Sequence, residues 1–79
     1  MTSPAPVFDG QKLKAVRLEQ GGDKAKREHG CVVLDVSYAT FENWETGKSA
    51  PNATNLFKLA DYYGVTAETF MSRPTGRKR

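Results

Sequence analysis

Apolar positions along this chain recur at spacings of three and four residues, the period of a helix that buries one face. The best stripe lies in the C-terminal half and comprises Leu56, Leu59, Ala60 and Tyr63. A narrower stripe near the N-terminus comprises Leu13, Val16 and Gln20. The apolar run at residues 31–34 is the one segment that is compatible with a strand. No Asn-Gly or Asp-Gly turn predicts a hairpin. The pattern therefore predicts an all-α fold.

Capping residues and glycines divide this pattern into five short helices. Their predicted starts are marked by Asp9, Asp23, Ser37, Pro51-Asn52 and Thr66. Their predicted ends are marked by Gly21-Gly22, Leu34, Gly47, Gly64 and Met71. Four aromatic side chains are expected in the core: Phe41, Trp44, Phe57 and Phe70. We expect the folded domain to span residues 9–72, between a disordered proline-rich leader (1–8) and a flexible basic tail (73–79).

Length and charge limit what this domain does. Seventy-nine residues suffice for one small domain with little room for an active-site cleft. The net charge of +3 suggests an anionic partner. However, four of the twelve basic residues lie in 73–79, so residues 1–72 hold eight basic and nine acidic side chains. The excess positive charge is thus a property of the tail.

Several classes of protein are excluded by composition. The single Cys31 and single His29 complete neither an internal disulfide nor a tetrahedral zinc site. The chain has no apolar run of about 18 residues, and residues 1–6 lack the features of a secretory signal. Because the single cysteine forms no internal disulfide, we expect a cytoplasmic protein. No nucleophile–base pair or phosphate-binding glycine loop is present, so we expect a protein that is not an enzyme and needs no cofactor or metal.

The spacing between the second and third predicted helices is that of a helix-turn-helix. Cys31 is small enough to let two helices approach, Val36 fills the turn, and Phe41 and Trp44 anchor the second helix to the core. The outward face of that second helix then carries short or hydrogen-bonding side chains: Ser37, Tyr38, Ala39, Glu42 and Asn43. Such a face suits a DNA major groove about 12 Å wide.

The residues from Val36 to Lys48, followed by Pro51, resemble the V-S-x-x-x-I-x-x-W-E-x-G-x-x-x-P block of the Cro/repressor-like (XRE-type, lambda-repressor-like) helix-turn-helix family. Residues 13–17 resemble the L-k-x-L-R of the family's first helix, and residues 56–66 resemble its L-x-K-L-A-x-x-L-G-V-S segment. The resemblance covers about residues 10–71. It implies a compact five-helix domain and a regulator that binds double-stranded DNA, of bacterial or phage origin, acting as a repressor or Cro-like switch.

The resemblance also implies roles for individual residues. Arg17 and Glu45 would form a structural ion pair. The expected DNA contacts are Arg27, Ser37, Tyr38, Ala39, Thr40, Glu42, Asn43 and Lys48, with Tyr38 and Ala39 at base edges. The expected auxiliary phosphate contacts are Lys24, Lys26, Arg77, Lys78 and Arg79. A homodimer through the fourth and fifth helices is expected on DNA, with no small-molecule ligand.

The sequence departs from the family pattern at two residues and in the length of one connection. Arg27 replaces a glutamine or similar residue, Asp35 replaces the glycine of the turn, and the first connection is about three residues longer than usual. The added residues, 22–24, either extend the second helix back to Asp23 or form a loop. Two other functions also remain open: a protein-interaction module such as an antitoxin or adaptor, and a recombination accessory factor that bends DNA.

Overall fold

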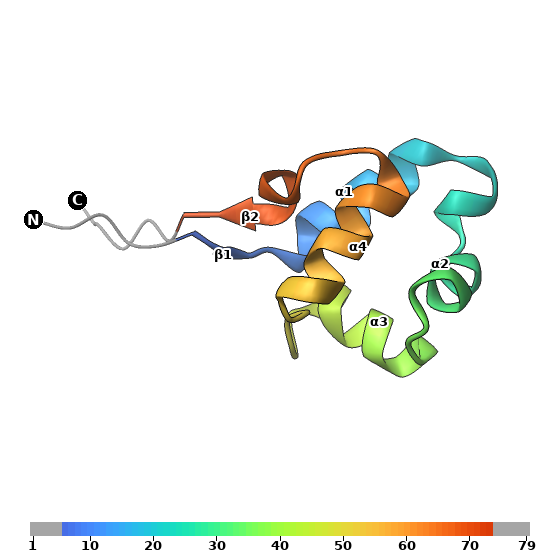
Figure 1. Cartoon of the computed structure of the whole chain (residues 1–79), viewed down its shortest axis with the longest axis horizontal. Helices are drawn as coiled ribbons and strands as arrows, with labels where there is room; N and C mark the ends of the chain where they lie inside the picture. Colours follow the sequence, from blue (N-terminus) through green and yellow to red (C-terminus); the bar gives the residue numbers. More distant parts are fainter. Residues whose placement is uncertain (1–5, 74–79) are drawn as a thin grey trace, which may run out of the picture.

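The computed structural model describes residues 6–73, and four α-helices build most of this part of the chain (Figure 1). They are α1 (Gly10–Gln20), α2 (Arg27–Leu34), α3 (Tyr38–Thr46) and α4 (Ala53–Tyr63). Two 3-10 turns follow α1 and α4, namely η1 (Gly22–Ala25) and η2 (Ala67–Phe70). A two-stranded antiparallel sheet of β1 (Val7–Phe8) and β2 (Met71–Ser72) joins the two ends of this unit. The fold is mostly helical, as the sequence predicts.

Side-chain caps fix where three of the helices begin. Asp9 accepts a hydrogen bond from the backbone N–H of Gln11, Ser37 from that of Thr40, and Asn52 from that of Asn55. Each bond satisfies an amide that has no partner inside its helix. These three starts agree with the positions expected from the sequence.

The second helix begins later than predicted. Residues 22–25 form η1, the chain becomes extended at Lys26, and α2 starts at Arg27. The added residues therefore neither extend α2 back to Asp23 nor form an open loop. Gly21 and Gly22 both have positive φ, which a continuous helix does not accommodate, so the chain reverses before it coils again.

The expected count of five α-helices is wrong within residues 6–73. The segment after Thr66 is the 3-10 turn η2, and Met71 is extended in β2. Val7 and Phe8, which we assigned to the disordered leader, instead pair with Ser72 and Met71. The rest of that leader up to residue 5, and the tail from residue 74, lie outside the part that the structure describes.

The core lies where the four helices meet and contains Leu13, Leu34, Phe41, Trp44, Leu59, Tyr63 and Phe70. Phe57 is not part of it, contrary to our expectation, because its side chain is 64% exposed on α4. The buried stripe of α4 follows Leu59, Ala60 and Tyr63, and position 57 lies outside that stripe. Among the described residues, no helix is long and apolar enough to cross a membrane.

Candidate nucleic-acid interface

The turn between α2 and α3 sets the angle at which these helices cross. Asp35 ends α2 in the left-handed conformation, with φ 59° and ψ 50°. The backbone N–H of Val36 then donates to the carbonyl of Cys31 at 3.0 Å, which closes the turn. Cys31 is buried and Val36 is partly buried against the core. An aspartate therefore adopts here the backbone conformation that glycine adopts at lowest cost.

The residues that we expect to contact DNA differ in how exposed they are on and around α3. Tyr38, Ala39, Glu42 and Lys48 are exposed, whereas Thr40 and Asn43 are partly buried. Ser37 caps α3 and its hydroxyl donates to Thr40 Oγ1 at 2.8 Å. Ser37 and Thr40 therefore fix the start of the helix, while Tyr38, Ala39 and Glu42 are exposed along it.

A buried carboxylate joins this helix to α1. Glu45 accepts from Arg17 Nε at 2.5 Å and from Arg17 Nη2 at 3.2 Å. The side chains of Arg17 and Glu45 are 8% and 1% exposed. Arg17 also donates to the carbonyl of Ala25 at 2.6 Å, so the pair holds η1 as well. Because removing one partner of a buried pair leaves an uncompensated charge, these contacts make α1, η1 and α3 interdependent.

The same carboxylate holds the first residue of α2. Arg27 Nε donates to Glu45 Oε1 at 3.0 Å, and Arg27 Nη1 donates to the hydroxyl of Tyr38 at 3.1 Å. The Arg27 guanidinium carbon lies 5.9 Å from the centre of the Tyr38 ring, within the range of a cation–π contact. The hydrogen bonds that Arg27 donates to Tyr38 and Glu45 raise the pKa of its guanidinium, and burial opposes this increase. Arg27 is thus a fixed cation at the solvent end of a network whose inner end is Arg17.

A family model described as helix-turn-helix matches residues 32–70, from the end of α2 through η2. This match, over just under half of the chain, supports the resemblance to the Cro/repressor-like helix-turn-helix family. Neither a curated protein nor a solved structure matches the chain. The matched segment includes the turn, α3 and α4, whereas Arg17 and Arg27 lie before it.

The predicted lysine contacts do not gather at α3 of this helix-turn-helix. Lys24 lies in η1 with its ammonium 5.4 Å from the centre of the Tyr62 ring on α4. Lys26 pairs with Asp23 at 3.7 Å, and both side chains are mostly exposed. Lys48 follows the C-cap Gly47 of α3 and is exposed. The three basic residues 77–79 lie outside the described part.

Sequence reasoning missed the link from Arg27 to Glu45 and Tyr38. The resemblance implies a DNA contact for Arg27 and an ion pair between Arg17 and Glu45, and it implies no contact of Arg27 with Glu45 or Tyr38. One signal was present: Arg27 replaces a neutral side chain in the family pattern, and a new cation near a buried carboxylate is attracted to it. The distance between the starts of α2 and α3 decides whether this contact forms, and it is not encoded in spacing alone.

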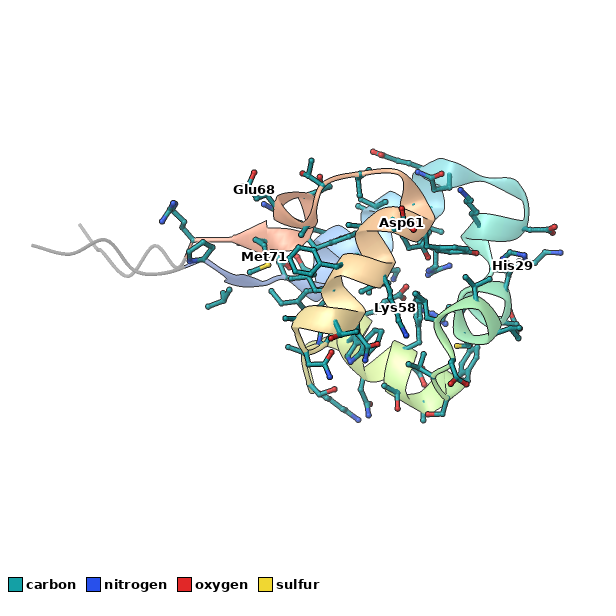
Figure 2. All side chains as sticks on the ribbon, viewed as in Figure 1. His29, Lys58, Asp61, Glu68 and Met71 are labelled. Atoms are coloured by element: carbon teal, nitrogen blue, oxygen red, sulfur yellow. The ribbon has the colours of Figure 1, made fainter. Side chains whose placement is uncertain are left out.

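A second polar contact, between α2 and α4, lies outside the expected site. His29 Nδ1 is 2.5 Å from the Tyr62 hydroxyl, and the two rings are stacked at 5.8 Å. Figure 2 shows His29 on the α2 side of the molecule, with Lys58 and Asp61 on α4. Among the described residues, no group of His, Cys, Asp and Glu has the arrangement of a metal site.

Proposed function

We propose that this protein is a sequence-specific regulator of transcription that inserts α3 into the major groove of double-stranded DNA. The observation that carries the proposal is the outward face of α3, where Tyr38, Ala39 and Glu42 are exposed on a helix that is capped and anchored at its other face. A rigid helix with short exposed side chains reaches base edges without reorganisation.

The contacts follow from the family resemblance and from exposure. Tyr38, Ala39, Glu42 and Asn43 would face the groove, and Arg27 and Lys48 would face phosphates on either side. Ser37 and Thr40 would contribute at the start of α3, where their hydroxyls already bond each other. Electrostatic contacts with phosphates would come from Lys24, Lys26 and the three basic residues 77–79. The strength of these contacts would depend on salt concentration and not on DNA sequence.

The test is selection of duplexes from a random pool, followed by fluorescence anisotropy at several salt concentrations. We expect a recovered consensus, and an affinity that falls linearly on a logarithmic scale with salt. Lys48→Ala should lower the salt slope by about 0.9 for one lost phosphate contact. Lys58→Ala is the matched control, because Lys58 is also an exposed lysine and extends from α4 (Figure 2), and it should leave the salt slope for a single half-site unchanged. Recovery of no consensus and no binding at low salt would exclude this function.

We further propose that two copies bind together through α4 and η2, with Phe57 at the contact. An exposed phenylalanine on an outer helix face is typical of an interface. Two bound copies would read half-sites roughly 34–36 Å apart. Phe57→Ser should abolish cooperative binding to a two-half-site duplex and preserve binding to a single half-site. Leu18→Ser, at a 58% exposed position on α1, is the control and should leave cooperativity intact.

One observation favours a second candidate, a module that binds another protein. Val32 and Val33 on α2 are 81% and 54% exposed, and apolar side chains of this size at the surface often mark a protein contact. Tyr38→Ala with Asn43→Ala separates the candidates, since it should abolish DNA binding and spare a protein contact through α2 or α4. A factor that bends DNA would bind the same duplexes, but gel mobility would depend on where the site lies in the fragment.

A further inference from the structure

Arg27 and Tyr38 are the first residues of α2 and α3, and their side chains meet across the gap between these helices. The guanidinium of Arg27 donates to the Tyr38 hydroxyl at 3.1 Å and lies over the same ring. Tyr38 is therefore directed toward α2, and the two side chains form one unit at the surface. Tyr38 is 44% exposed, so this unit faces solvent.

The Tyr38 hydroxyl can donate but has little capacity left to accept. The hydroxyl oxygen already accepts a hydrogen bond from Arg27 Nη1, while its own O–H has no hydrogen-bond partner among residues 6–73. Arg27 Nη2 also has no hydrogen-bond partner within the described chain. The unit thus offers at least two N–H or O–H donors from two different helices to a single acceptor group.

The charge of the unit is positive. Arg17, Arg27 and Glu45 carry two positive charges and one negative charge. Arg17 and Glu45 are buried, whereas the Arg27 side chain is 26% exposed, so the excess positive charge lies on the solvent side at Arg27. An anion with several oxygen acceptors fits this arrangement, and a phosphodiester has these properties.

The anchoring of Arg27 also argues against a role at base edges. Reading guanine takes a guanidinium fork that projects into the groove. Glu45 holds Arg27 Nε at 3.0 Å and Tyr38 holds Nη1, so the side chain stays close to the protein surface. A cation that is held at the protein surface contacts the part of DNA that passes across this surface, and that part is the sugar–phosphate backbone.

We propose that Arg27 and Tyr38 form a single phosphate clamp, and that Tyr38 positions the DNA backbone and does not read a base. The exposed residues that read base pairs then begin at Ala39 and continue with Glu42 and Asn43. This inference rests on the proposed DNA-binding function and assigns Tyr38 a role different from the base-edge contact that the family resemblance implies.

The test uses the full chain and a duplex selected by the wild-type protein from a random pool. Each phosphate of the duplex is replaced in turn by a neutral methylphosphonate, and affinities are measured for wild type, Arg27→Gln and Tyr38→Phe. Tyr38→Phe keeps the ring beside Arg27 and removes only the hydroxyl. Tyr62→Phe is the matched control, because that hydroxyl is bonded to His29 on another face.

We expect one phosphate whose neutralisation weakens wild-type binding about tenfold or more, the effect of losing a charge-assisted hydrogen bond. Neutralising that same phosphate should change the affinity of Arg27→Gln by less than about twofold, because this variant has already lost the charged contact, and should weaken Tyr38→Phe less than wild type, because only the hydroxyl contact is missing there. Tyr38→Phe should weaken binding to all duplexes by a similar factor. Its salt slope should match that of wild type, whereas Arg27→Gln should lower the slope by about 0.9.

Other outcomes overturn the clamp. If Tyr38→Phe changes the preferred base at any position of single-substituted duplexes, Tyr38 reads sequence. If the two variants lose their sensitivity to neutralisation at different phosphates, the two side chains act separately. Circular dichroism checks that each variant folds, and Arg27→Lys provides a second substitution that keeps the charge but loses the fork. Failure of wild type to bind any duplex would instead refute the proposed function itself.

Discussion

Replacing Glu45 by glutamine is the sharpest test of how this small domain is held together. The carboxylate accepts three hydrogen bonds, two from Arg17 and one from Arg27. Glutamine has nearly the same shape but only one acceptor oxygen, and its amide group donates. In the Glu45→Gln variant, therefore, at least one arginine donor faces another donor, and Arg17 becomes a buried cation with no counter-charge.

The expected loss of stability is large for a chain of this length. Breaking a buried ion pair by removing one partner costs about 3–5 kcal/mol. A domain of 79 residues has a total unfolding free energy of roughly 4–12 kcal/mol, at about 0.05–0.15 kcal/mol per residue. Glu45→Gln should therefore remove at least about a quarter of the stability, and it should unfold the domain at room temperature if the total lies at the lower end of this range.

Urea denaturation followed by circular dichroism and by Trp44 fluorescence measures this effect, because Trp44 is the only tryptophan and is 3% exposed. Asp23→Asn is the control, since it removes the exposed pair with Lys26 and should cost under about 1 kcal/mol. The double variant Arg17→Met with Glu45→Leu should recover much of the lost stability, as apolar replacements of buried pairs often do. The reasoning is wrong if Glu45→Gln costs no more than Asp23→Asn, or if the double variant is no more stable than Glu45→Gln.

Three further measurements address the backbone and the ends of the domain. Gly10→Ala should destabilise by at least about 1–3 kcal/mol, because a Cβ there would lie 2.1 Å from the carbonyl oxygen of Trp44; a neutral effect in thermal melts would contradict this close approach. Asp35→Gly should stabilise by up to about 1 kcal/mol through relief of the left-handed conformation, and a lower melting temperature would count against it. The Ser72 hydroxyl donates to Asp9 at 2.7 Å and holds the pKa of that carboxyl below its usual value. That stabilisation is present above the unfolded pKa of about 3.9 and is lost as the pH falls through the folded value; Ser72→Ala should raise the Asp9 pKa in an NMR titration, and an unchanged value would show that the bond is absent in solution.

Local chemistry explains which parts of the fold were predictable. Asp9, Ser37 and Asn52 begin helices because their side chains satisfy nearby amides, and this depends only on neighbouring residues. The β1–β2 pairing was not predictable, because strands of two residues have no measurable period and their partners are more than sixty positions apart. The misplacement of Phe57 could have been avoided, since it lies off the helical stripe that predicts α4.

The candidate site also has one part that the sequence predicts and one part that it does not. The exposed face of α3 follows from helical period once Phe41 and Trp44 are recognised as anchors. The contact between Arg27 and Tyr38 depends on how far apart two helices begin, and that distance is set by the turn at Asp35 and by η1 together. Spacing along the chain predicts which residues share a face, but not which long side chains on different helices meet.

The pairing of β1 with β2 brings the two ends of this domain together. Val7 lies opposite Ser72 and Phe8 opposite Met71, so the two ends of the described unit are neighbours (Figure 1). Protein units with adjacent ends tolerate insertion into a surface loop of another protein, because the host's two cut ends need not move apart. This helix-turn-helix unit therefore has a form that suits insertion into a host chain, because both of its connections leave from the same two-stranded sheet.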